Sequence, residues 1–379
     1  MSPVSRGRKP KKNKVKKKAT PRGITNVPLD HVSDRPAWFD ESVRTVVDQA
    51  DVLLAANGPR ELEQATAELL GGHLYRALTE EAKGLAFAAW FAEVRTAAVD
   101  RVNQPGVLRL LYGMASIDPR RQALHHINQV PTPEQPEWLR LMPDVQATGR
   151  VVKMRDVYGS RLGFIAEYAY PGGVDPSVFL FDVDASDLIE FRQPGVHDDV
   201  PSAAAAWRAA VGDSAKDAEP VEVRSPEELL ALVEVTRGHV MGDESRAALD
   251  NWFRAPRRIE DLAAARPNRG LPRARSLFDN IPLEAMSDAF TSWYVDRHHV
   301  QPDQVAVEDL AETWLEGALP ETYHSVSPGR IRMMHALAGD WNDQSAAEAA
   351  LALLPEWVRW HGEQAGVPVD LLEEAVRTA

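Results

Sequence analysis

The chain has 379 residues, of which 44% are hydrophobic, so it holds enough apolar material for at least one large core. It contains no cysteine, which excludes disulfides, thiol nucleophiles, iron–sulfur clusters and cysteine zinc sites. The formal net charge is −13, and this charge is divided unevenly along the chain. Any chemistry must therefore use oxygen, imidazole or amine groups.

The first 22 residues carry ten positive charges, and the first acidic residue is Asp30. Nine of these cations fall within the thirteen residues RGRKPKKNKVKKK: Arg6, Arg8, Lys9, Lys11, Lys12, Lys14, Lys16, Lys17 and Lys18. The remaining 33 cations face all 56 acids, so the rest of the chain carries about −23. Residues 1–33 are rich in Pro, Gly and Lys and lack apolar periodicity, which predicts a disordered basic tail.

The basic start is not followed by the apolar segment of a secretory signal peptide. The longest apolar stretch elsewhere, Gly84–Val94, is far shorter than the ~20 residues that a membrane span needs. We therefore expect a soluble, cytoplasmic protein that has no membrane partner.

Apolar residues recur with helical spacing from Trp38 onward, which predicts an N-terminal helical region over residues 34–145. The first helix is expected to stop at Gly58-Pro59. The next runs through Gly71-Gly72, where the two glycines predict either a kink or the close approach of a neighbour. A helix over residues 82–102 is apolar nearly all round in its middle, so we expect it to be buried.

Between residues 146 and 200 the pattern changes to a period of two, which predicts an antiparallel β-meander. Four strands are expected, at residues 148–156, 160–170, 177–184 and 187–193. The connections between them are so short that neighbouring strands must be antiparallel. Because the third strand is apolar on both faces, we expect helices to cover both sides of the sheet.

Helical periodicity returns after residue 200 and predicts a C-terminal helical region over residues 201–379. Ser225 is the expected N-cap of one helix, and residues 307–319 form an amphipathic helix with an acidic outer side. The chain is thus predicted to be an α+β protein, mainly helical, with a small central antiparallel sheet of about four strands and a disordered basic tail. Whether the two helical regions share one core stays open.

Three runs carry a resemblance to known sequences: YGSRLGFIAEYAYPGGVDPSVFLFDVDAS, VMGDESRAALDNWFRA and LLPEWVRWHGEQAGVP. Together with the basic start, they resemble uncharacterised proteins of high-GC Gram-positive bacteria, over most of the chain. That family has no established activity, so the resemblance implies no catalytic residue. It implies only that this architecture and a basic tail occur together.

The residues that look most suited to chemistry follow the third predicted strand: Asp182, Asp184, Asp187, His197, Asp198 and Asp199. Asp182 and Asp184 are two positions apart on a strand, so they share a face and could bind a divalent cation such as Mg²⁺ or Mn²⁺, with His197 nearby. Such a site would suit a metal-dependent hydrolase. Alternatively, these aspartates bond backbone N–H groups, as aspartates at strand ends and turns commonly do.

Several histidines have both a functional and a structural interpretation. The pairs His125-His126 and His298-His299 cannot chelate a metal alone, because adjacent residues on a helix diverge by about 100°. A position beside the C-terminal end of a helix dipole is the simpler role for the second pair. His73, at the edge of a leucine stripe, is expected to be a satisfied, semi-buried residue.

Arginines gather late in the chain, in a body that is short of cations: Arg254, Arg257, Arg258, Arg266, Arg269, Arg273 and Arg275. Guanidinium groups match phosphate and carboxylate geometry, so this segment could be a second anion-binding patch. Alternatively, these arginines pair with the acidic residues of the body.

Two functions of different classes follow from these patterns. In the first, the protein is a non-enzymatic binding protein whose tail contacts a polyanion, RNA or DNA, or folds over its own acidic body. In the second, it is a metal-dependent hydrolase that uses the Asp/His cluster at residues 182–199. The sequence holds no phosphate-loop, dinucleotide-binding, nucleophile-elbow or HExxH motif, so it identifies no cofactor beyond a possible divalent metal, and a protein partner is also possible.

Overall fold

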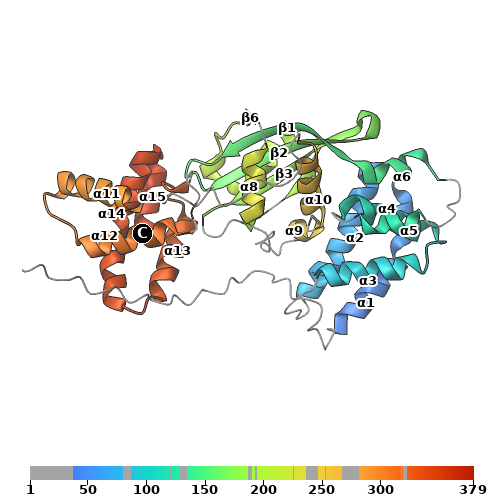
Figure 1. The fold of residues 1–379 in the computed structure, drawn as a ribbon, viewed down its shortest axis with the longest axis horizontal. Helices are drawn as coiled ribbons and strands as arrows, with labels where there is room; N and C mark the ends of the chain where they lie inside the picture. The colour runs from blue at the N-terminus through green and yellow to red at the C-terminus, as the bar shows by residue number, and fades with distance from the viewer. Residues whose placement is uncertain are drawn as a thin grey trace, which may run out of the picture.

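We describe the protein from a computed structural model. The described residues are 37–79, 87–118, 121–128, 135–186, 190–192, 194–224, 226–235, 246–251, 253–266, 281–316, 318 and 322–379. The predicted tail and Ser225 lie outside them. N-terminal helices, a central sheet and a C-terminal helical bundle follow one another along the molecule (Figure 1). The fold is therefore α+β and mainly helical, as predicted, and no described helix is both long and apolar enough to cross a membrane.

The N-terminal helices are α1 (Ala37–Asp48), α2 (Pro59–Thr79), α3 (Phe87–Val99), α4 (Pro105–Ile117), α5 (Gln122–Ile127) and α6 (Glu137–Leu141). The start of α2 at Pro59 agrees with the predicted break at Gly58-Pro59. The two glycines do not end α2. A Cβ on Gly71 would lie 2.7 Å from the backbone of Asp250, so this glycine admits the close approach of α9 (Arg246–Asp250).

The strands are β1 (Gln146–Arg155), β2 (Arg161–Tyr170), β3 (Val174–Asp184), β4 (Glu190–Phe191), β5 (Gly195–His197) and β6 (Val221–Val223). Over the described residues they form one antiparallel sheet of order β4-β3-β2-β1-β6, in which β5 also pairs with β3. The first three agree closely with the predicted strands. The sheet is larger than the predicted four strands because β5 and β6, of three residues each, are too short to show an alternation.

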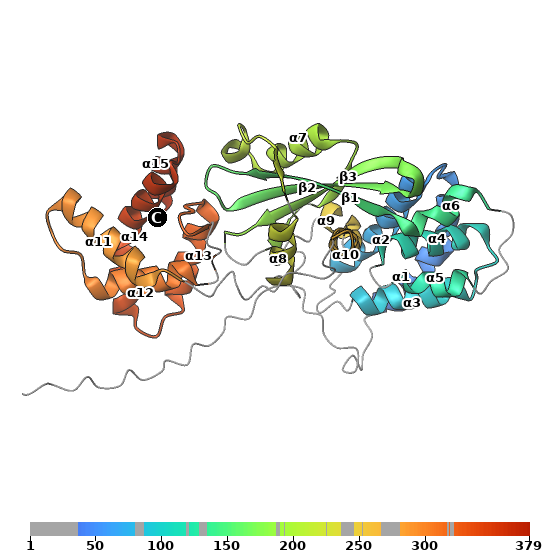
Figure 2. The same cartoon turned by 45° about the horizontal axis from the view of Figure 1, so that its top comes forward.

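Helices cover both faces of the sheet, as the two-sided apolar pattern of β3 predicted (Figure 2). On one face, Trp207 of α7 (Val200–Val211) packs with Ile165 and Leu180. On the other, Phe164 and Phe181 join the core that includes α8 (Glu227–Val235) and α10 (Arg254–Ala264). Neighbouring positions along β3 therefore belong to different cores.

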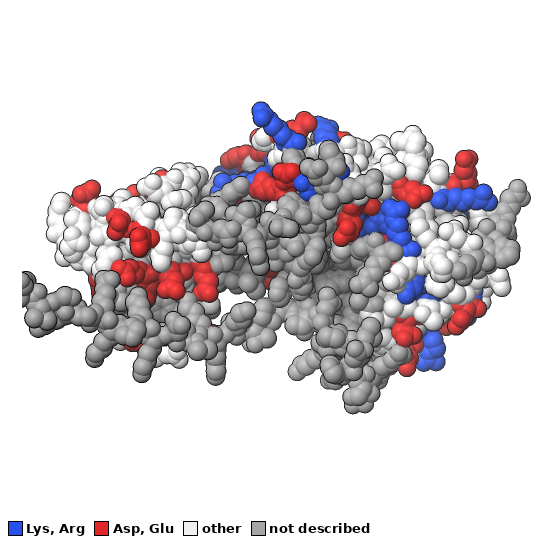
Figure 3. Space-filling model, viewed as in Figure 1, with Lys and Arg blue, Asp and Glu red and all other residues white. Residues whose placement is uncertain are grey.

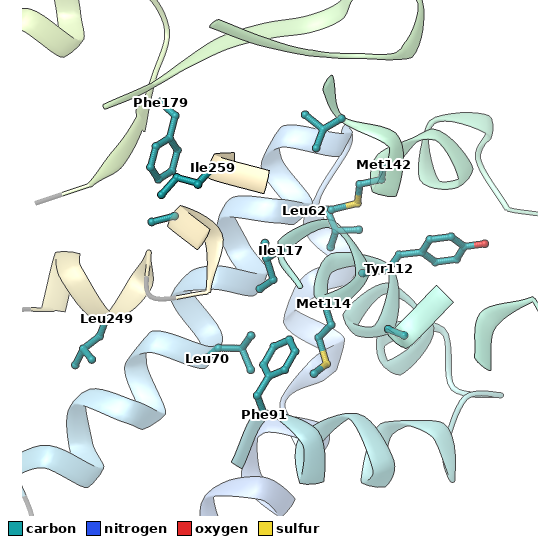
Figure 4. Packing of buried hydrophobic residues seen from close by; sticks show 14 of the residues in the cluster. Leu62, Leu70, Phe91, Tyr112, Met114, Ile117, Met142, Phe179, Leu249 and Ile259 are labelled. Atoms are coloured by element: carbon teal, nitrogen blue, oxygen red, sulfur yellow. The ribbon is translucent and has the colours of Figure 1, made fainter. Parts of the chain in front are cut away.

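One hydrophobic core extends from the N-terminal helices to the sheet (Figure 4). Leu62 of α2, Phe91 of α3 and Met114 of α4 belong to the same buried cluster as Phe179 of β3 and Ile259 of α10. The helices α8, α9 and α10 follow the sheet in sequence and yet share this core with the first helices of the chain.

The C-terminal bundle consists of α11 (Leu283–His298), α12 (Gln304–Leu315), α13 (Pro328–Gly339), α14 (Gln344–Ala365) and α15 (Val369–Thr378). It has a core of its own, in which the predicted apolar stripe of α12 is buried. Tyr158, in the turn between β1 and β2, joins this core, and its hydroxyl lies 3.5 Å from the carbonyl oxygen of Leu371. The turn thus connects the sheet to the bundle.

Candidate functional site

The two aspartates predicted to hold a metal are bound by an arginine. Asp182 is fully buried, and Arg161 of β2 donates to both of its oxygens, from Nε to Oδ1 at 2.7 Å and from Nη2 to Oδ2 at 2.8 Å. Trp207 Nε1 donates to the same Oδ1 at 3.0 Å. Asp184 shares this face, as predicted, and accepts from Nη1 of Arg161 at 3.2 Å. One guanidinium therefore faces both carboxylates.

Asp184 has further partners at the end of β3. Its Oδ1 accepts the backbone N–H of Ser186 at 3.0 Å and the Ser186 hydroxyl at 2.6 Å, and its Oδ2 accepts from Arg192 at 3.3 Å. Burial raises the pKa of Asp184, but the hydrogen bonds from Ser186 and the charges of Arg161 and Arg192 outweigh it, so the pKa lies below its ordinary value. This geometry agrees with the structural interpretation of the cluster.

The structure does not bring His197 to these aspartates. His197 lies on β5 opposite Val178, whereas Asp182 is four positions further along β3, or about 13 Å away along the strand. The predicted set of Asp182, Asp184 and His197 therefore does not converge. Asp187 lies outside the described residues, and among those described no three His, Asp or Glu side chains are placed to hold a metal ion.

Asp198 and Asp199 line a shallow hollow of about 320 Å³ beside the start of α7. Asp198 pairs with Arg60 of α2 at 2.6 Å, and Asp199 caps α7 by accepting a backbone N–H of its first turn at 2.8 Å. Two other charged residues of the hollow, Arg150 and Glu167, pair with each other at 2.6 Å. These charged groups are thus engaged with protein partners.

The arginine-rich segment is largely buried where it is described. Arg254, Arg257 and Arg258 lie on α10 and are at most 3% exposed, and Arg266 pairs with Glu227 at 2.9 Å. The rest of the predicted patch lies outside the described residues: Arg269, Arg273 and Arg275. For the described arginines, pairing with acidic residues is the interpretation that is confirmed.

Glu63 of α2 is the centre of a buried charge network, which we call the Glu63 network and which comprises Glu63, Tyr170, Arg254 and Arg258. Arg258 Nη2 lies 2.5 and 2.6 Å from the two carboxylate oxygens, Tyr170 donates its hydroxyl to Oε2 at 2.9 Å, and Arg254 Nη1 is 3.8 Å from Oε1. Burial raises the pKa of Glu63, but Arg258 and Arg254 outweigh it and hold the pKa below its ordinary value. Glu63 is therefore ionised at neutral pH.

The arginines of α10 have further fixed partners. Arg254 donates from Nε and Nη2 to Oδ1 of Asn251 at 2.9 and 2.6 Å, and from Nη1 to Oε1 of Gln64 at 2.9 Å. Arg257 Nε lies 2.9 Å from both carboxylate oxygens of Asp261. The network therefore acts as an ionic connection between α2, β2 and α10 and offers no group poised for proton transfer.

Comparisons of the chain with protein-family models, curated proteins and solved structures find no match. No chemistry can therefore be carried over to the Glu63 network from another protein. The functional argument rests on the charges and contacts of this chain.

The C-terminal bundle holds a histidine cluster that the sequence did not predict. Nδ1 of His324 and Nδ1 of His361 are 2.8 Å apart. His361 is fully buried on α14, where its ring stacks on Trp314 with centroids 5.3 Å apart and lies 4.5 Å from Trp360. The two histidines are 37 positions apart, so no local spacing identifies them.

The histidines that the sequence did single out lie at helix ends or are buried beside a polar partner. Residues 125–126 lie in the last turn of α5, and residues 298–299 end α11, with His298 Nε2 3.2 Å from Oε2 of Glu356. His73 is 6% exposed, and its Nε2 lies 3.3 Å from Oε1 of Gln49. His73 is thus satisfied, as its position predicted, but it is buried and not semi-buried.

Proposed function

We propose that the protein is a non-enzymatic binding protein whose basic N-terminal tail contacts a nucleic acid, RNA or DNA. The observation that carries this proposal is the charge density of the tail, with nine cations in residues 6–18 and no acid before Asp30. Segments rich in lysine and free of aromatic residues neutralise phosphates without reading the base sequence. The tail would therefore supply affinity and not sequence specificity.

The charge of the body supports a contact confined to the tail. Figure 3 shows acidic side chains on the visible face of the C-terminal bundle, and charges of both signs over the sheet and the N-terminal helices. The buried arginines of α10 are engaged inside the fold, so they are not available to phosphates. A polyanion would be repelled by the body, whose excess of acids is large, and attracted by the tail.

The hydrolase interpretation has less support. Arg161 occupies the carboxylates of Asp182 and Asp184, which are the groups that would have to bind the metal. A divalent cation would have to displace a guanidinium that makes hydrogen bonds to both aspartates. We therefore base the proposed function on the tail.

The test compares the native chain with a full-length variant in which the nine cations of residues 6–18 are replaced by Gln. Binding of labelled duplex DNA and single-stranded RNA is measured by fluorescence anisotropy at graded salt. For the native chain we expect the logarithm of the binding constant for duplex DNA to fall with the logarithm of the salt concentration with a slope no steeper than about −9, because up to ten cations displace counterions. For the variant we expect a slope no steeper than about −1.

A control variant replaces four exposed cations of the body by Gln: Arg44, Lys216, Arg224 and Arg332. It should bind like the native chain. Equal binding by the native chain and the tail variant would show that the tail is not the binding element. Absence of binding by the native chain at low salt would contradict the proposed function as a whole.

A further inference from the structure

His324 and His361, the histidine pair of the C-terminal bundle, have no part in the proposed function. Because their Nδ1 atoms are 2.8 Å apart, one ring must donate an N–H and the other must accept it with a bare Nδ1. Only one of the two Nδ1 atoms can carry a proton while His324 and His361 hold this geometry. The contact is therefore sensitive to the protonation state of the pair.

The surroundings of His361 disfavour a positive charge. The side chain is fully buried, and three tryptophan rings lie within 5.3 Å of its ring centroid: Trp314, Trp357 and Trp360. Neither Nε2 of His361 nor Nε1 of Trp357 makes a hydrogen bond with any described residue. A protonated His361 would thus present an unsatisfied charged donor to an apolar environment, which is strongly unfavourable.

The charged and titratable groups that face His361 are His324, beside Tyr323 in residues 322–327, and Arg330 of α13. The helices α11 and α12 present aromatic side chains to the same cluster, and Leu372 of α15 packs against the adjacent Gly362. Burial, then His324 and Arg330, lower the pKa of His361 well below its ordinary value. Burial and Arg330 also lower the pKa of His324. Both rings are therefore neutral at neutral pH.

The histidine pair lies where the bundle meets the sheet. Residues 322–327 precede α13, and Trp314 donates from Nε1 to the carbonyl oxygen of Tyr323 at 2.9 Å. Ser327 caps α13, and its hydroxyl lies 3.2 Å from that of Ser186, in the loop that binds Asp184. A change at the histidine pair would therefore reach the contact between bundle and sheet.

We propose that His324 and His361 form a pH-sensitive latch, which holds residues 322–327 on α14 at neutral pH and releases them in acid. The first proton binds Nε2 of His324, the less buried ring, and its Nδ1–H still donates to Nδ1 of His361. The second proton must bind Nδ1 of His361, so that two N–H groups would face each other at 2.8 Å. The rings then separate, and water solvates both.

In the closed state the pKa values of both histidines are lowered, whereas in the released state they are ordinary, at about 6.5. Below pH 6.5 the released state therefore binds more protons than the closed state. The equilibrium constant for release therefore rises as the pH falls. Each histidine contributes up to about tenfold per pH unit, so the pair contributes up to about 100-fold per pH unit. Well above pH 6.5 the equilibrium is independent of pH.

Hydrogen exchange of the full chain, measured by mass spectrometry, tests the latch. The pH range is about 7.5 to about 5, because it contains the ordinary histidine pKa. After correction for intrinsic exchange rates, peptides covering residues 322–327 and His361 should lose protection more steeply than tenfold per pH unit. His324→Gln should reduce the dependence to at most about tenfold per pH unit. His335→Gln, which changes an exposed histidine of the same bundle, should leave it as in the native chain.

A native chain whose protection in these peptides does not change with pH would overturn the proposal. So would a His324→Gln variant with the pH dependence of the native chain. His361→Gln is the stronger perturbation of the pair, and the native profile together with His324→Gln decides the question even where that variant does not fold.

Discussion

Glu63→Gln is the sharpest test of the Glu63 network. The change keeps the shape of the side chain and an acceptor for Tyr170, but removes the charge opposite the buried Arg258. Loss of one partner of a buried ion pair costs about 3–5 kcal/mol, because the other charge is left uncompensated. Asp261 lies 3.5 Å from Nη1 of Arg258 and compensates in part, so we expect about 3 kcal/mol, the lower end of this range.

Urea unfolding of the full chain at neutral pH measures the loss of unfolding free energy. The unfolding is followed by circular dichroism and by hydrogen exchange of α2. The expected value is a large fraction of the ~5–15 kcal/mol that stabilises a typical protein. Glu167→Gln is the control, since it breaks a surface pair with Arg150, and it should cost at most about 1 kcal/mol. The reasoning is refuted if Glu63→Gln costs no more than this control.

The loss should also depend on pH. Because folding lowers the pKa of Glu63 from 4.5, its ionised form stabilises the fold above that pH, and the stabilisation is lost as the pH falls through the folded-state pKa. The difference in unfolding free energy between the native chain and Glu63→Gln should therefore shrink in acid. An equal difference in acid and at neutral pH would mean that shape, and not charge, is lost.

Three further predictions concern other parts of the fold. Gly71→Ala places a Cβ 2.7 Å from the backbone of α9 and should cost about 1–3 kcal/mol in urea unfolding, whereas Gly339→Ala, with open space around its Cβ, should not destabilise. Burial raises the pKa of Asp156 to about 6. Above pH 7 Asp156 is therefore a buried charged group and near pH 4 it is largely neutral, so Asp156→Asn should raise the melting temperature more above pH 7 than near pH 4. Equal shifts at the two pH values would contradict this. Because Arg161 binds Asp182, we expect Mg²⁺, Mn²⁺, Ca²⁺ and Zn²⁺ to leave the melting temperature unchanged; a rise that Asp182→Asn abolishes would support a metal site instead.

Long periodic patterns predict the fold well. The strands β1, β2 and β3 and the buried stripe of α12 each extend over enough residues for a period to be visible. The short strands β5 and β6 have no such period, and their place in the sheet depends on pairing with distant residues.

The sites were harder to predict than the fold, because the residues that form them are far apart in sequence. Arg258 contacts Glu63 at a separation of 195 positions. The sequence of a run of arginines does not show whether their side chains face water or a buried carboxylate. The spacing of Asp182 and Asp184 did predict their shared face. Arg161 stands opposite Asp184 in the hairpin register, so pairing the two predicted strands would have placed this cation beside the aspartates.

The partnership of α2 with α10 also sets the order in which the chain can mature on the ribosome. Glu63 is synthesised 195 positions before Arg258, which at 5–20 residues per second is an interval of about 10–40 s. Until α10 emerges, the first helices lack their cationic partners and expose apolar surface. The C-terminal bundle draws its helices from one contiguous stretch, residues 283–378, and can assemble as soon as it is made. Chains interrupted before α10 should therefore depend on chaperones or be degraded.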